Sequence, residues 1–177
     1  MNDETATAPI GRPRSNEARL AVLHAVDDML VEDGYAAMTM KGIAARAGVG
    51  KQTVYRWWSS KAEILLEAVR RDAAHELAIE EGTTTSDEID RYLASVVRFL
   101  TRSHAGAAYR ALVGEAQHDA KVAALIRSSD VLAEAAVPVV ERAIKRGDFP
   151  EDTVVADAAA RIVGPVFFRI MTGQANV

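Results

Sequence analysis

The stretch IAARAGVGKQTVYRW, residues 43–57, constrains the fold more than any other part of the chain. Ala44 is small enough for a close contact between helices, and Gly48 stands where a turn with a left-handed backbone would be needed, which glycine adopts at little cost. The branched residues on either side can form an apolar plug beneath that turn: Ile43, Val49 and Val54. The spacing predicts two short helices joined by a tight turn, a helix-turn-helix.

The second of these helices has a polar outer face. Its residues outside the apolar plug are Gly50, Lys51, Gln52, Thr53, Tyr55 and Arg56. In helix-turn-helix proteins the second helix lies in the major groove and its side chains contact base edges. The pattern therefore predicts binding to double-stranded DNA.

Charge supports this prediction locally. The chain is acidic as a whole, with 21 basic and 25 acidic side chains. Residues 41–61 contain five basic residues and no acidic one, whereas residues 62–177 contain 13 basic and 18 acidic residues. A basic segment in an acidic chain is typical of a nucleic-acid-binding surface. A solvated helix pair with clustered charge is the alternative.

Composition limits the remaining possibilities. With 177 residues and 49% hydrophobic side chains, the chain is large enough for one large or two small domains with a substantial core. It has no cysteine, which excludes disulfides and thiolate metal sites. The N-terminus lacks an apolar signal segment, and no apolar run reaches the ~18 residues of a membrane span. We expect a soluble, cytoplasmic protein that has no contact with a membrane.

Helical periodicity runs along the chain, so we expect an all-α fold. A first helix should end at Gly34, a second should run from the cap Thr39 to about Ala47, and a third from about Gly50 to Trp58. Ser60 and Glu63 form a capping box for a helix that should reach about Glu81. Beyond a turn at 82–86 with Ser86 as a cap, we expect helices at about 87–104, 107–117, 119–146 and 152–172, with breaks at Gly106, Gly147 and Pro150.

The order of these elements, with the sequence TVYRWWSSKAEIL, resembles the TetR family of bacterial transcription regulators. The resemblance covers residues 12–66 and lies in the pair Gly34 and Tyr35, in Thr39, in the IAARAGVG block, and in Tyr55, Trp58 and Lys61. It implies a flexible arm (1–15), an N-terminal three-helix helix-turn-helix domain that binds DNA (16–61), and a C-terminal helical domain for ligand binding and dimerisation (62–177).

Residues 147–173 are similar to the late helices of an actinobacterial-type C-terminal subgroup. Members of this subgroup continue with another amphipathic helix, whereas this sequence ends at Val177. We nevertheless expect a homodimer, with an interface formed by 119–146 and the Ala-rich helix 152–172, because one recognition helix reads too few base pairs.

Roles in DNA binding follow from reach and chemistry. Lys51 and Gln52 should contact base edges, and Arg56 a base or a phosphate. Thr53 could touch a phosphate or a thymine methyl group. By resemblance, Tyr55, Lys61 and Lys41 contact phosphates or nearby DNA, and Thr39 and Gly50 belong to the same surface. Trp58 should lie in the core, while Trp57 could flank a phosphate or pack.

The arm carries the sequence GRPR. Arg12 and Arg14 could reach into a minor groove, as arginines of other arms do. The alternative is a disordered tail with incidental charge.

The C-terminal region should bind an unknown small molecule in a mainly apolar cavity. The candidates for its lining are Phe99, Tyr109, Arg110, Glu115, Phe167 and Phe168, with Arg110 as a polar anchor and Tyr109 as a wall. Each has a simpler interpretation as a core or surface residue. We expect a repressor that leaves a palindromic operator when the ligand binds.

Two other classes of protein stay open: a DNA-binding protein without a ligand switch, and an enzyme built on a helical bundle. None of the four histidines has the spacing of a metal-ligand motif, and no hydrolase or nucleotide fingerprint occurs. His118 with Glu115 and Asp119 is either a polar helix end or a metal or acid–base cluster. We expect no enzyme activity, metal or cofactor.

Overall fold

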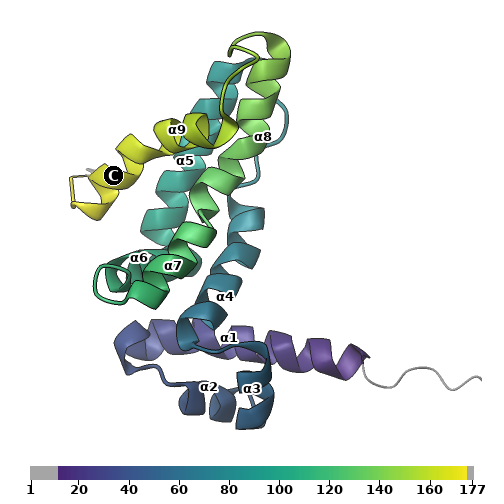
Figure 1. Cartoon of the computed structure of the whole chain (residues 1–177), viewed down its shortest axis with the longest axis vertical. Helices are drawn as coiled ribbons and strands as arrows, with labels where there is room; N and C mark the ends of the chain where they lie inside the picture. Colours follow the sequence, from purple (N-terminus) through teal and green to yellow (C-terminus); the bar gives the residue numbers. More distant parts are fainter. Residues whose placement is uncertain (1–11, 175–177) are drawn as a thin grey trace, which may run out of the picture. The chain divides into compact units, whose positions relative to one another are not determined.

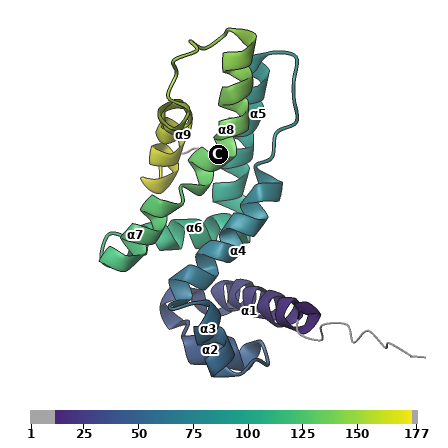
Figure 2. The ribbon, with the colours of Figure 1, turned by 45° about the vertical axis from the view of Figure 1, so that its right-hand side comes forward.

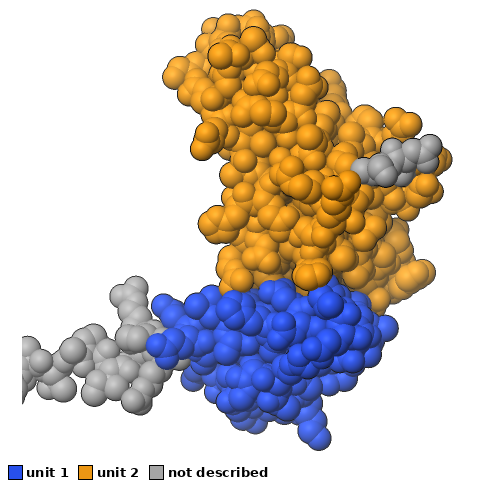
Figure 3. Space-filling model, turned by 180° about the vertical axis from the view of Figure 1, so that it is seen from behind, with its two compact units in different colours: residues 1–64 blue, residues 65–177 orange. Residues whose placement is uncertain are grey.

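The computed structural model describes residues 12–174. Within this range the chain folds into helices only, as expected. It divides into two compact units, residues 1–64 and 65–177 (Figure 3), and the division falls inside α4 (Lys61–Glu76). None of the described helices has the length and apolar character to cross a membrane.

Unit 1 contains α1 (Arg12–Ala37), α2 (Met40–Arg46), α3 (Lys51–Trp57) and the first turn of α4. The buried face of α1 includes Val22 and Val26, both without exposed surface. The expected end of this helix at Gly34 is a kink instead: the residue has φ 74° and ψ 164°, and helical structure resumes up to Ala37. The helix begins at Arg12, so part of the expected flexible arm is helical.

The helix-turn-helix is built as the sequence predicts. Thr39 caps α2, and its side-chain oxygen accepts a hydrogen bond from the Gly42 N–H at 3.0 Å. Gly48 has φ 63°, which explains the glycine at the turn. Ile43 and Val54 are fully buried, and Val49 is half-buried beneath the same turn.

The capping box of α4 forms in a modified way. The Ser60 hydroxyl accepts a hydrogen bond from the Glu63 N–H at 3.3 Å, as predicted. The Glu63 carboxylate, however, accepts from the N–H of Ser59 at 2.7 Å and from its hydroxyl, one residue earlier than a regular box requires.

The helix α4 ends at Glu76, so its predicted extension to Glu81 is wrong. The backbone that follows is held by side chains of α8 (Val131–Arg146). Arg142 donates to the Ile79 carbonyl at 3.2 Å, and Arg146 donates to the Gly82 carbonyl at 2.9 Å. Since these carbonyls bond to arginines, the segment does not need a helical hydrogen-bond pattern.

The cap of α5 (Thr85–Arg102) also differs from the prediction. Thr84, not Ser86, is the N-cap, and its side-chain oxygen accepts from the Asp87 N–H at 3.2 Å. In the GTTTS stretch three threonines precede the serine, and spacing gives no means to choose among four hydroxyl residues that all suit a cap.

Gly106 does not end or interrupt a helix, contrary to the prediction. It lies inside α6 (His104–Glu115), which therefore begins three residues earlier than predicted. A Cβ atom at this position would collide with the backbone carbonyl of Phe99 in α5. The glycine thus permits close packing of α5 and α6, and it is not a turn signal.

The predicted helix 119–146 is two helices, α7 (Ala120–Ser128) and α8. Asp130 starts the second one, because its carboxylate accepts from the Ala133 N–H at 3.0 Å. Gly147 ends α8 with φ 81°, as expected. The last helix is α9 (Val155–Met171), which starts three residues later than expected. Figures 1 and 2 show α5 and α8 side by side, with α9 against both.

Candidate nucleic-acid interface

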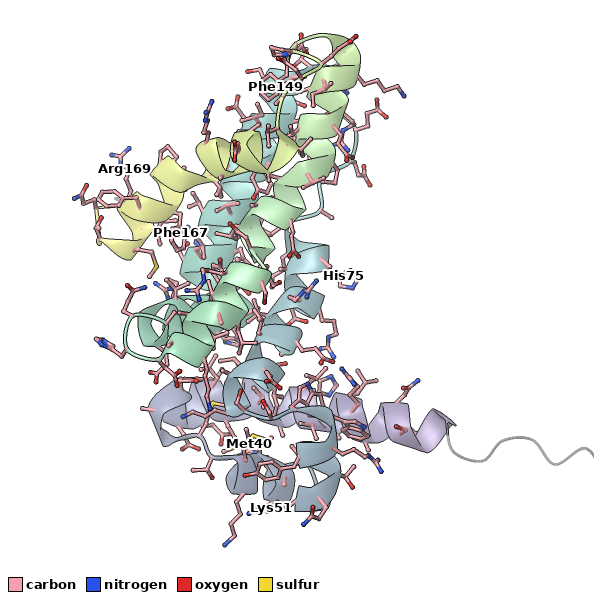
Figure 4. The ribbon with its side chains drawn as sticks, viewed as in Figure 1. Met40, Lys51, His75, Phe149, Phe167 and Arg169 are labelled. Carbon is pink, nitrogen blue, oxygen red and sulfur yellow. The ribbon has the colours of Figure 1, made fainter. Side chains whose placement is uncertain are left out.

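The outer face of α3 is as polar as the sequence predicts. Lys51, Gln52 and Arg56 are exposed, and Tyr55 is 45% exposed. Val54 and Trp58 are buried on the opposite face, which confirms Trp58 as a core residue. Figure 4 shows Lys51 projecting from the helix. The buried pair fixes the orientation of the helix, so the polar side chains are presented together.

Aromatic rings lie next to the cations of this face. The Lys51 ammonium is 5.4 Å from the centroid of the Tyr55 ring, and the Arg56 guanidinium is 5.6 Å from that of Trp57. Trp57 is half-buried and meets Trp58 edge to face, with centroids 5.5 Å apart. These contacts restrict the cations to one face without neutralising them.

Other predicted DNA-binding residues occupy the neighbouring elements. Lys41 is exposed in the first turn of α2, and Gly50 is the exposed N-cap residue of α3. Thr53 is half-buried. The Thr39 hydroxyl caps α2 and is exposed, so it still has acceptor capacity toward solvent.

Lys61 has protein partners that sequence reasoning did not anticipate. Its ammonium donates to the carbonyls of Tyr35 at 2.8 Å and Met38 at 3.0 Å, and it lies 4.2 Å from the centroid of the Tyr35 ring. A cation gains nothing from the first turn of its own helix. The carbonyls of Tyr35, in α1, and of Met38, just after it, stabilise the ammonium instead. The sequence had suggested a phosphate for this role.

Arg46 is the second basic residue with an internal partner. Its guanidinium forms two hydrogen bonds of 2.6 Å with Glu32 of α1 and lies 3.7 Å from Asp28. The hydrogen bond from Arg46 holds the pKa of Glu32 below its ordinary value. Of the five basic residues in 41–61, Lys41, Lys51 and Arg56 remain exposed with no acidic partner among the described residues.

The arginines of the GRPR sequence are only partly covered by the structure. Arg12 and Arg14 belong to the first turn of α1, but their side chains lie outside the described residues, as do residues 1–11.

The predicted ligand-binding residues of unit 2 separate into two groups. Tyr109 and Phe167 line a pocket of about 220 Å³ together with residues of α8 and α9, and their ring centroids are 6.2 Å apart. Phe99 is fully buried in the core, and Phe168 is 60% exposed. Arg110 and Glu115 are half-buried and do not line this pocket. Of the six predicted ligand-binding residues, only Tyr109 and Phe167 lie together at this pocket.

Two family descriptions match the chain. Residues 22–68 match the bacterial regulatory proteins of the tetR family, and residues 78–177 match the Tetracyclin repressor-like C-terminal domain. The chain belongs to the TetR family. It is accordingly a DNA-binding transcription regulator with the ligand-binding type of C-terminal domain.

Relatives and a solved structure are similar to different lengths of the chain. The HTH-type transcriptional regulator YdeS of Bacillus subtilis (strain 168) is 32% identical over 163 residues, which are 91% of this chain and 82% of YdeS. The repressor KstR of Mycobacterium tuberculosis is 28% identical over 103 residues, 55% of this chain and 47% of KstR. The solved structure of the TetR family transcription regulator SCO0332 has a TM-score of 0.76 at 28% identity and covers 91% of this chain and 90% of its own.

Within this TetR-family C-terminal unit, a buried charge cluster escaped sequence reasoning. Glu88 of α5 has no exposed surface and accepts from Arg142 at 2.7 Å, from Arg146 at 2.6 Å and from the Gly82 N–H at 2.8 Å. Burial raises the pKa of Glu88, but the bonds from Arg146, Gly82 and Arg142 outweigh it, so the pKa falls to about 2. Arg142 and Arg146 are four residues apart and so lie on one face of a helix. This spacing was the signal in the sequence that could have indicated a shared acidic partner.

Proposed function

We propose that the protein is a homodimeric repressor that binds a palindromic operator and releases it when a small molecule occupies unit 2. The observation that carries this proposal is the exposed row Lys51, Gln52, Tyr55 and Arg56 on α3, fixed by the buried Val54 and Trp58. A short helix with long donors on one face suits the major groove, where bases present distinct donor and acceptor patterns.

Roles within the interface follow from reach and exposure. Lys51 and Gln52, at the N-terminal end of α3, are assigned to base edges. Tyr55, Arg56, Lys41, Thr39 and Thr53 are assigned to the sugar–phosphate backbone, where they set the register of the protein on DNA. Lys61 mainly orients the end of α1, and its third N–H is left for a phosphate.

Repression is favoured by two named relatives. KstR of Mycobacterium tuberculosis and TetR of Mycobacteroides abscessus are both described as repressors, although FasR of Mycolicibacterium smegmatis is described as an activator. A repressor released by a ligand requires that the ligand bind the DNA-incompetent state more tightly, because equal affinity shifts no population. As a DNA-bound regulator, the protein would act in the cytoplasm.

The experiment is a selection of DNA sites with the purified protein, followed by binding titrations of the enriched site. A palindrome with half-sites about 34–36 Å apart, or a multiple, is expected. Gln52→Ala and Lys51→Ala should each cost about 1–3 kcal/mol at one base position and relax the preference there. Tyr55→Phe should weaken binding to all sequences alike.

The control for these variants is Gln117→Ala, an exposed glutamine of unit 2. It should change neither affinity nor preference. Enriched sites without two-fold symmetry, or α3 variants with unchanged preference, would contradict the assignment. A protein that no compound displaces from its operator would be a constitutive DNA-binding protein.

A further inference from the structure

The pocket between α6, α8 and α9 is lined by apolar and aromatic side chains and by one carboxylate, that of Asp130. We propose that it binds a small organic cation, an ammonium ion attached to a compact apolar body. This inference names the ligand class of the regulator proposed above. Binding of the cation itself does not depend on whether the ligand releases DNA.

The walls of the pocket are apolar. Tyr109 of α6 and Phe167 of α9 meet at an interplanar angle of 60°, and Leu132 and Val163 are buried beside them. Figure 4 shows Phe167 on the side of α9 toward the helical bundle. Gly164 adds no side chain, and a Cβ atom there would meet nothing within 4 Å. The volume of about 220 Å³ is below the ~300 Å³ at which drug-sized sites begin, so the ligand is small.

The polar group of the pocket is the carboxylate of Asp130. One oxygen accepts from the Ala133 N–H at 3.0 Å, and this bond holds the side chain at the start of α8. Among the described residues, no lysine or arginine forms an ion pair with Asp130. Its neighbour Glu134 differs, because Arg70 lies 3.5 Å from that carboxylate. Asp130 is exposed, so its second oxygen is open to a ligand as well as to water.

The negative charge of Asp130 affects the neighbouring Tyr109. Burial raises the pKa of Tyr109, and the charges of Asp130 and Glu134 raise it further. The phenol thus stays neutral and adds no competing negative charge. Aromatic faces attract cations, and a carboxylate forms charge-assisted hydrogen bonds with an ammonium group. The aromatic faces and the carboxylate both disfavour an anionic ligand.

This assignment replaces the expected anchor by one of opposite charge. Arg110 would have favoured an anion, but it does not line the pocket, and its Nε atom is buried without a hydrogen-bond partner. The preceding residue, Tyr109, lines the pocket instead. The sequence order of these two residues does not show which one the helix turns inward.

The test compares three probes of similar size by isothermal calorimetry on the DNA-free protein: 2-phenylethylamine (a cation at pH 7), 2-phenylethanol (neutral) and 3-phenylpropionate (an anion). We expect the amine to bind at least about tenfold more tightly than the alcohol, and the anion to bind more weakly than either. Asp130→Asn should remove the preference for the amine over the alcohol, because asparagine keeps the helix cap but not the charge.

The matched control is Asp119→Asn, which alters the cap of α7 outside the pocket. It should bind all three probes like the wild type. Ala160→Leu, which fills the pocket from α9, should abolish binding of the amine. Equal binding of the three probes, no binding by any, or an amine preference that survives Asp130→Asn would overturn the inference. Displacement of operator DNA is measured separately, so that an amine that binds as expected but leaves DNA bound refutes the ligand switch alone.

Discussion

Arg46 and Arg56 each occupy the last turn of a short helix in unit 1, yet their surroundings differ. Arg46 is bonded to Glu32, whereas Arg56 is exposed beside Trp57. Only a cation that neutralises a phosphate displaces counterions from DNA. We therefore expect Arg56→Ala to reduce the slope of log K against log salt by about 1, and Arg46→Ala to leave that slope unchanged.

Operator titrations at several KCl concentrations measure both slopes. An equal reduction of the slope in the two variants would mean that Arg46 leaves Glu32 and contacts a phosphate when DNA binds. That result would contradict the prediction for Arg46.

Glu88 permits a second prediction at the residue scale. Glu88→Gln removes the charge but retains the shape, and it leaves Arg142 and Arg146 without the carboxylate that they share. Removing one member of a buried ion pair is costly, and we expect the free energy of unfolding to fall by about 3 kcal/mol. Glu81→Gln, at a side chain that is 75% exposed and has its carboxylate 3.5 Å from Arg146, is the control and should have little effect. Urea denaturation measures both.

The same residue makes stability depend on pH. The folded pKa of Glu88 is about 2, below the ~4.3 of an unfolded glutamate. Its contribution is therefore fully present above about pH 4.3 and is lost as the pH falls toward 2. In the Glu88→Gln variant the acid side of the stability profile should be flatter, and a profile as steep as that of the wild type would be inconsistent with this role.

At the scale of elements, two glycines of α6 lie in opposite environments. Gly106 packs against the Phe99 carbonyl of α5, whereas nothing lies within 4 Å of a Cβ atom at Gly114. Gly106→Ala should force the helices apart and cost about 1–3 kcal/mol. Gly114→Ala should stabilise the protein by roughly 0.5–1 kcal/mol, because alanine is the better helix former. Thermal unfolding distinguishes the two, and a stabilising Gly106→Ala would refute the close contact.

The elements also show how far sequence reasoning extends. The bounds of α2 and α3 were predicted to within about a residue, because Thr39, Gly48 and the apolar plug all lie within one short stretch of the sequence. Gly106 was misinterpreted as a break since its reason lies in another helix. The end of α4 depends on arginines more than 60 residues away. For the interface, exposure on α3 was predictable from periodicity, but the partners of Lys61 and Arg46 lie in α1 or just after it and leave no local signal.

For the whole molecule we predict a dimer. Val154 and Phe168, near the two ends of α9, are 62% and 60% exposed, and we predict that a second copy of the chain buries them. Phe168→Glu should therefore produce a monomer that binds the palindromic operator weakly. Val31→Glu, at a residue of α1 that is 56% exposed, is the matched control and should remain dimeric. Light scattering at micromolar concentration measures the mass, and a monomeric wild type would disprove the prediction.

The segment between α4 and α5 has a practical consequence. Residues 77–84 look like a connecting segment into which a tag or a fluorophore could be inserted. Their backbone is held at Ile79 and Gly82 by two arginines, and Thr85 just beyond bonds to Asp148 at 2.6 Å. An insertion here would break these hydrogen bonds and expose Glu88, whose carboxylate is the least exposed among the described residues. Reporter groups belong instead at positions such as Gln117, an exposed residue whose hydrogen bonds are local, to the carbonyls of Val113 and Gly114.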